Sequence, residues 1–156
     1  MNSNVITNGA GEQMRFLRTS ANTDGAVVEF EATIEPGTQG PPAHVHLKQE
    51  ERFTVLRGTM AVRVGHEELI LRPGDQHVVP AGVAHTWRLV GDETLVARAE
   101  LRPALRFEEF IRDAFAMLAA NGGRLDPSKV GPILAKYQDE YRFASAEEIQ
   151  LEEIPV

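Results

Sequence analysis

Residues 40–58 of the chain read GPPAHVHLKQEERFTVLRG, and this stretch places His44 and His46 at alternate positions. Side chains at positions i and i+2 of a β-strand point to the same face, about 6 to 7 Å apart, so the two imidazoles can converge on one ion. Neutral imidazole is a common ligand of transition metals. The spacing therefore predicts a strand that carries two metal-binding histidines.

A carboxylate is needed to balance the charge of such a metal, and the same stretch offers Glu50 and Glu51. Strand parity separates them, because Glu51 shares a face with the apolar Phe53, whereas Glu50 alternates with polar neighbours. The inward carboxylate is therefore expected to be Glu51. Its five-residue separation from His46 is out of phase on one unbroken strand, so a turn or bulge is expected at residues 47–49.

Short strand-like runs separated by turn residues extend on both sides of this stretch. Residues 26–34, AVVEFEATI, alternate apolar and polar side chains with a period of two. Further runs of the same kind follow between residues 52 and 101, and the residues between them are rich in Gly and Pro. About seven short strands at this spacing are typical of an antiparallel sandwich or barrel. We therefore predict an all-β core over residues 1–103.

The pattern changes from strand to helix after Pro103. Apolar residues recur with helical spacing from Phe107 to Leu118, which predicts an amphipathic helix that packs on the rest of the protein. We expect residues 104–143 to form a helical extension of the same domain. Residues 144–156 are acidic and weakly patterned, and we expect them to form a partly mobile tail.

A second helix is predicted to begin at Asp126, because Asp is a favoured N-cap and Pro127 suits the first helical position. Its apolar residues extend through Tyr137 to Tyr141. Pro132 leaves two alternatives, since proline lacks an N–H and disrupts the preceding turn. Either one helix continues through this residue, or a short turn ends before it and a new helix begins there.

Two motifs in residues 40–89 resemble those of the cupin superfamily. The first motif has two histidines one residue apart, then a glutamate and a glycine, and its matches here are His44, His46, Glu51 and Gly58. The second motif runs Gly, five residues, Pro-x-Gly, two residues and His, and its matches here are Gly74, Pro80, Gly82 and His85.

This resemblance implies a cupin-type jelly-roll β-barrel with C-terminal α-helices, and one divalent transition metal inside it. The metal ligands that it implies are His44, His46, Glu51 and His85. One or two coordination positions would then be free for water or substrate. Imidazole with carboxylate suits Fe, Mn, Ni, Co or Zn, and no feature of the sequence ranks these metals.

The side chains expected to face the interior are mainly apolar. Strand parity predicts a substrate pocket at Phe53, Val55, Val62, His77 and Trp87. For His77 the alternatives are a structural role and a place in the cavity as an acid–base group. For Trp87 they are core filling and stacking on a substrate. An apolar interior favours a hydrophobic or aromatic organic molecule over a nucleotide sugar.

Two classes of function remain open. The first is a mononuclear metal-dependent enzyme that acts on a small, fairly apolar organic substrate, with dioxygenase-like oxidation favoured over an isomerase or lyase reaction. The second is a non-catalytic module that binds a small molecule in the same pocket. We favour the enzyme, because the chain shows no DNA-binding or signalling domain to which a sensor would report.

Composition excludes several other classes of protein. With 16 Lys and Arg against 23 Asp and Glu, the net charge of −7 opposes binding to nucleic acid. The absence of Cys rules out disulfides and thiolate ligands. The N-terminal residues do not resemble a signal peptide, and the longest apolar run, Ala114 to Ala120, is far too short for a membrane span. We expect a cytoplasmic homodimer whose partner is a small molecule, with no nucleic-acid or membrane partner.

Overall fold

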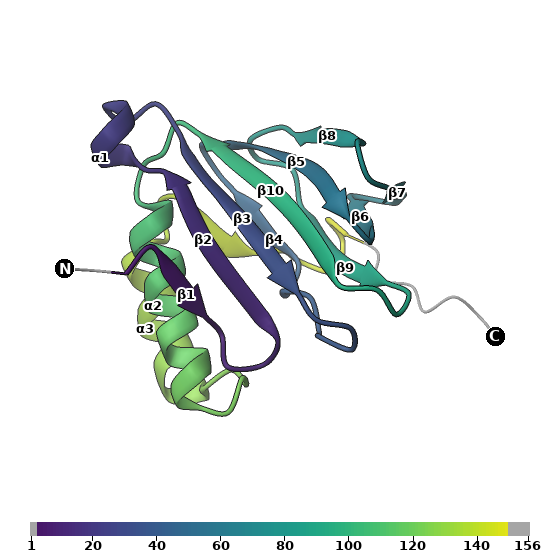
Figure 1. Cartoon of the computed structure of the whole chain (residues 1–156). Helices are drawn as coiled ribbons and strands as arrows, with labels where there is room; N and C mark the ends of the chain where they lie inside the picture. The colour runs from purple at the N-terminus through teal and green to yellow at the C-terminus, as the bar shows by residue number, and fades with distance from the viewer. Residues whose placement is uncertain (1–2, 150–156) are drawn as a thin grey trace.

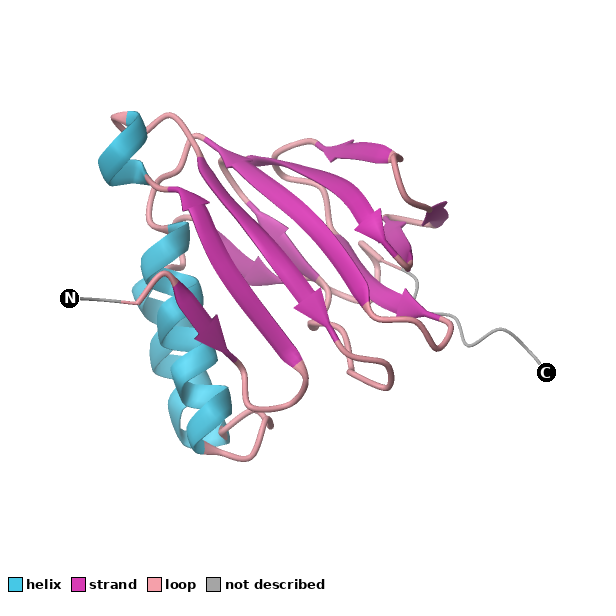
Figure 2. Ribbon diagram, viewed as in Figure 1, coloured by secondary structure: helices cyan, strands magenta, loops and turns pink. Residues whose placement is uncertain are grey.

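The structure, a computed structural model, describes residues 3–149 of the 156-residue chain. Two antiparallel β-sheets face each other, and two longer helices lie beside them (Figures 1 and 2). The predicted fold class, a mostly β structure with C-terminal helices, is confirmed. Most predicted strands between residues 26 and 101 are also found.

The elements are numbered in chain order. The six-stranded sheet has the order β1 (Val5–Thr7), β2 (Glu12–Arg18), β3 (Val28–Ile34), β10 (Leu95–Arg102), β5 (Glu50–Arg57) and β8 (Gln76–Val79). The five-stranded sheet has the order β11 (Tyr141–Phe143), β4 (His44–His46), β9 (His85–Val90), β6 (Thr59–Val64) and β7 (Glu67–Leu71). The helices are α1 (Ser20–Thr23), α2 (Phe107–Ala120) and α3 (Pro127–Lys136).

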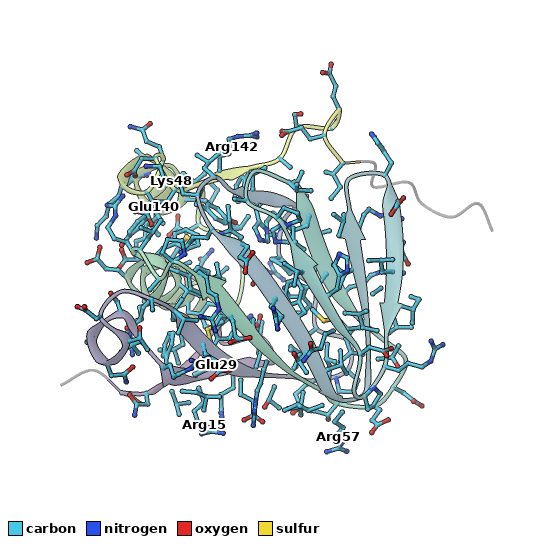
Figure 3. The ribbon with its side chains drawn as sticks, turned by 90° about the horizontal axis from the view of Figure 1, so that it is seen from above. Arg15, Glu29, Lys48, Arg57, Glu140 and Arg142 are labelled. Carbon is cyan, nitrogen blue, oxygen red and sulfur yellow. The ribbon has the colours of Figure 1, made fainter. Side chains whose placement is uncertain are left out.

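The central strands of the six-stranded sheet bury one face and expose the other. Along β3 and β10 the apolar residues at alternate positions are buried, and Phe30 pairs across the strands with Ala99. The outer face carries ion pairs, such as Arg15 with Glu31 at 2.6 Å, and Figure 3 shows Arg15 on that face. Because a one-residue slip would exchange the two faces, this alternation fixes the register of the strands.

Gly58 allows the tight connection between β5 and β6. Its φ of +80° lies in the left-handed region, where residues with a side chain are strained. A Cβ at this position would also lie 2.7 Å from the carbonyl oxygen of Thr94. The glycine of the first sequence motif is therefore required by the backbone and not by chemistry at the site.

Helix α2 covers the inner face of the six-stranded sheet where the five-stranded sheet does not reach. In Figure 1 it lies behind β1 and β2, alongside α3. Phe107, Phe110 and Phe115 of α2 are buried, and the Phe107 ring stacks on Phe30 with a centroid distance of 5.6 Å. The core therefore includes residues of both sheets and of α2.

The second predicted helix differs from the structure at its C-terminal end. Asp126 caps α3 as predicted, accepting a hydrogen bond from the backbone of Ser128, and one helix continues through Pro132. The prediction that Tyr141 belongs to this helix is wrong, because Tyr141 begins β11 and pairs with His46 of β4. Within the described part of the chain, no helix is long and apolar enough to cross a membrane.

The predicted acidic tail is described only in part. Its first residues, 144–149, follow β11, and Ile149 is buried with 2% exposure against Val45 and Ala84. Ile149 is thus packed on the five-stranded sheet, whereas residues 145–147 are exposed. Residues 150–156 lie outside the described residues.

Deletion of residues 104–156 is expected to give an aggregated or unfolded product. It removes the aromatic side chains of α2 from the core, and burying each is worth about 1.5 to 3 kcal/mol. The sum is comparable with the whole stability of a domain, about 5 to 15 kcal/mol. Solubility and thermal unfolding of the truncated chain test this, and a soluble product with an unchanged melting temperature would contradict it.

Candidate metal centre and cavity

Four residues that are distant in the sequence meet between the two sheets. His44 and His46 lie on β4, Glu51 on β5, and His85 at the start of β9, directly opposite His44. One potential ligand atom from each lies within 4.8 Å of the others. All four side chains are buried. We call these four residues the His–Glu group, and they are the same residues that the sequence motifs predict as metal ligands.

The loop of residues 47–49 decides which glutamate faces the site. It carries the chain from β4 in the five-stranded sheet to β5 in the six-stranded sheet, so the predicted break is a crossing between sheets. Gln49 is buried and its amide donates hydrogen bonds to the carbonyl oxygens of Pro103 and Ala104, at 2.9 and 2.8 Å. With this loop fixed, Glu51 is buried and Glu50 is exposed.

The same loop is held against the C-terminal region. The backbone N–H of Leu47 donates to the carbonyl oxygen of Glu140 at 2.8 Å, and Figure 3 shows Lys48 and Glu140 on the same side of the molecule. Arg106 forms an ion pair with the Glu140 carboxylate at 2.6 Å. The segment before β11 therefore holds in place the loop of residues 47–49, which joins the two strands that carry His44, His46 and Glu51.

Backbone carbonyls orient two of the imidazole rings. Nδ1 of His44 lies 2.8 Å from the carbonyl oxygen of Pro42, and Nδ1 of His85 lies 3.0 Å from that of Val83. Because a carbonyl only accepts, each Nδ1 carries the proton and donates. This leaves Nε2 of each ring for the centre of the group, an arrangement typical of metal-binding histidines.

The electrostatics of His44 and Glu51 favour the protonation states that metal binding requires, whereas burial of His85 is outweighed by its hydrogen bond with Glu51, which raises the pKa of His85. Burial lowers the pKa of His44 to about 3, and the neighbouring imidazoles add to this effect. Burial acts to raise the pKa of Glu51, but hydrogen bonds with His46 and His85 outweigh it and hold that pKa well below its usual value. At neutral pH His44 is therefore neutral and Glu51 anionic, as metal ligands must be.

The donor set fits one transition-metal ion. Ligand atoms bound at about 2.1 Å lie roughly 3 to 4.2 Å from one another, and the atoms of the His–Glu group already lie within 4.8 Å. Nε2 of His85 is 3.0 Å and Nε2 of His46 is 3.3 Å from the same Glu51 oxygen. Three imidazoles and one carboxylate suit Fe, Mn, Ni, Co or Zn.

A cavity of about 100 Å³ adjoins the His–Glu group. His44, His46 and Glu51 contribute to its lining, together with residues of β2, β3, β10 and α2. Most of its other walls are apolar, and they include Phe30, Ala32, Phe53, Ala99, Phe107 and Phe110. A small and largely apolar molecule is the ligand that such walls suit.

The structure places only some of the predicted pocket residues at this cavity. Phe53 and Trp87 line it, whereas Val55, Val62 and His77 are not among its lining residues. Both valines are fully buried in the core. His77 lies on β8 at the edge of the six-stranded sheet, while the strands of that sheet that line the cavity are β2, β3, β10 and the first part of β5.

Two polar residues of the cavity are absent from the sequence prediction. Tyr141 on β11 stacks on the His44 ring with a centroid distance of 5.2 Å, and burial together with the nearby Glu51 charge raises its pKa. Its hydroxyl is therefore a neutral hydrogen-bond donor beside the His–Glu group. Glu12 on β2 is the second residue, and burial raises its pKa to about 7.

Comparisons with known proteins agree with this geometry. A family model described as "Cupin domain" matches residues 30–98. Quercetin 2,3-dioxygenase of Bacillus subtilis is 32% identical over 117 residues, which cover 69% of this chain and 33% of that protein. Oxidoreductase OpS7 of Beauveria bassiana is 33% identical over 89 residues, which cover 53% of this chain and 29% of that protein. The chain thus spans about a third of the length of these curated relatives.

Among solved structures, an RmlC-like cupin from Shewanella frigidimarina matches with a TM-score of 0.56 and 19% sequence identity. The match covers 67% of this chain and 86% of that one. At this level of identity the likeness concerns the fold alone.

Proposed function

The chain belongs to the cupin superfamily, and on that premise we propose that it is a mononuclear metal-dependent enzyme with a small, largely apolar organic substrate. The reaction that we favour is dioxygenase-like oxidation, in which both atoms of O₂ enter the substrate and no further co-substrate is needed. The observation that carries this proposal is the buried His–Glu group at the wall of an apolar cavity.

The names of the curated relatives support an oxidation over an isomerase or lyase reaction. One is a dioxygenase and the other an oxidoreductase, and the dioxygenase alignment covers 69% of this chain. An apolar cavity also suits an aromatic substrate better than a sugar acid or a phosphate, because those would need cationic partners. Among the described lining residues there is no Lys or Arg.

The roles of the residues follow from their positions. His44, His46, Glu51 and His85 would hold the metal, which when bound supplies Lewis-acid and oxygen-activating chemistry. The aromatic walls exclude water and orient the substrate, and water exclusion strengthens the polar interactions that remain. The Tyr141 hydroxyl, neutral and close to the His–Glu group, can donate a hydrogen bond to an oxygen of the substrate.

We expect metal-free protein reconstituted with Fe, Mn, Ni, Co or Zn to retain about one metal ion per chain with at least one of them. The loaded protein is expected to consume O₂ when given a flavonol such as quercetin or a smaller diketone or catechol. Elemental analysis and an oxygen electrode measure the two results separately.

The control for this experiment is a pair of histidine variants. His85→Asn removes a residue of the His–Glu group and is expected to lose both metal and oxygen uptake, whereas His66→Asn changes an exposed turn residue and is expected to keep both. Metal content near zero with all five metals would refute the proposal. Metal retention and tight ligand binding without turnover would instead support the non-catalytic binding module.

We further propose that the protein is a cytoplasmic homodimer. The support for a dimer is that β7 and β8 are edge strands of the two sheets, and exposed edges are protected when a second copy covers them. Sedimentation analysis of the full chain measures its oligomeric state.

A further inference from the structure

Glu12 places a carboxyl group in the wall of the cavity, away from the His–Glu group. It is the first residue of β2 and only 9% exposed. In residues 3–149, no hydrogen bond or ion pair of its carboxylate is found, although its backbone N–H donates to the Asn8 side chain at 3.1 Å. Its oxygens are also not among fully enclosed atoms without a partner. The carboxylate therefore keeps some accessible surface, and Glu12 is among the residues that line the cavity.

Strand register puts Glu12 and Glu51 at opposite ends of the cavity wall. Glu12 is level with Ile34, which is level with Leu95 on β10. Glu51 is level with Leu101, six residues further along the same strand. Six residues of a strand span about 20 Å, so a ligand must extend along the cavity to approach the His–Glu group with one end and Glu12 with the other.

A carboxyl group at this position works against stability. Moving a polar group from water into apolar surroundings without a hydrogen-bond partner is unfavourable, and the neighbours of Glu12 in the wall include the apolar Met14 and Ile34. Burial raises its pKa to about 7, with no nearby charge among the causes. A methionine or leucine would suit the core better, so the carboxyl group requires another explanation.

We propose that Glu12 is a specificity-determining residue that binds a hydroxyl group at the end of the ligand remote from the His–Glu group. This inference rests on the proposed function, because it describes the substrate of the same cavity. A neutral hydroxyl fits better than an ammonium group, because a cation would lose its hydration against walls that are otherwise apolar. The substrate class is thus an elongated aromatic or alicyclic molecule with a hydroxyl opposite its reacting end.

The test uses two probes of the same shape, 2-naphthol and 2-methylnaphthalene, which differ only in a hydroxyl and a methyl group. Isothermal titration calorimetry measures both dissociation constants, for the full chain in metal-free and zinc-loaded form. We expect the wild type to bind 2-naphthol about five- to tenfold more tightly, which is the usual effect of one hydrogen bond. Glu12→Met is expected to abolish this preference, and Glu12→Gln, which keeps an accepting oxygen, to retain most of it.

The outcomes separate this inference from the proposed function. If Glu12→Met keeps the wild-type preference, or if the wild type has none, the inference about Glu12 is overturned even when the protein binds metal and consumes O₂. If metal content stays near zero but the preference depends on Glu12, the enzyme proposal fails and the ligand site stands. A merely structural role of Glu12 would lower the melting temperature of Glu12→Met without changing the ratio of the two dissociation constants.

Discussion

Replacement of Glu51 by glutamine is expected to weaken metal binding by at least about 100-fold. Glu51 is the only carboxylate of the His–Glu group, and its oxygen lies 3.0 Å from His85 Nε2. Glutamine has nearly the same shape but no negative charge, so it removes the anionic ligand from an enclosed site. Even substitution of residues that only orient a metal ligand typically costs about 10- to 100-fold in affinity.

The matched control is Glu50→Gln, the same chemical change one residue earlier. Glu50 is exposed and lies level with Arg102 of β10. Because its side chain is not directed into the buried site, its substitution is expected to leave metal affinity unchanged. Dialysis of both variants against a mild chelator, followed by elemental analysis, compares the two positions directly. Loss of metal from Glu50→Gln with retention by Glu51→Gln would show that the ligand assignment is wrong.

The second large effect concerns stability and pH. We expect Glu12→Gln to become more stable relative to the wild type by about 3 kcal/mol as the pH rises from 4 to 8. The pKa of Glu12 is about 7 in the folded protein and 4.5 without burial. Between these values the unfolded chain releases its proton and the folded protein keeps it, so the wild type loses stability as the pH rises through this range.

Urea denaturation of the metal-free proteins at several pH values measures this difference. Glutamine does not titrate, so subtracting the two stability curves removes the contributions of the His–Glu group, which both proteins share. Glu67→Gln, at an exposed position on β7, serves as the control for the loss of one negative charge. A stability difference that is the same at pH 4 and pH 8 would mean that Glu12 is solvated or paired in solution.

Much of the fold could be predicted because its central strands have one buried and one solvent-exposed face. In β3 apolar and polar residues alternate without interruption, in β10 they alternate from Ala97 onward, and the same alternation in β5 separates Glu51 from Glu50. Strand β2 also alternates, with Met14 and Phe16 buried, but its first inward position is occupied by Glu12. Because a carboxylate interrupts the apolar series at this position, the sequence predicted neither β2 nor the contribution of Glu12 to the cavity lining.

The errors in the C-terminal region and the pocket have a common cause, which is tertiary contact. Tyr137 and Tyr141 have the four-residue spacing of a helix, yet Tyr141 pairs with His46 on β4, and local sequence carries no signal for that pairing. Parity similarly indicates which face of a strand His77 shares with Val79. It does not indicate that β8 lies at the sheet edge, away from the cavity.

The pairing of β11 with β4 also sets an order of events during protein synthesis. Phe143 and Tyr141 lie opposite His44 and His46, so the strand that covers these two histidines emerges from the ribosome about 95 residues after them. Until then β4 is an open edge, because its other neighbour in the sheet, β9, covers only one side. The His–Glu group is thus enclosed only after β11 has been synthesised, and an ion captured earlier would occupy an incomplete site from which it can still exchange.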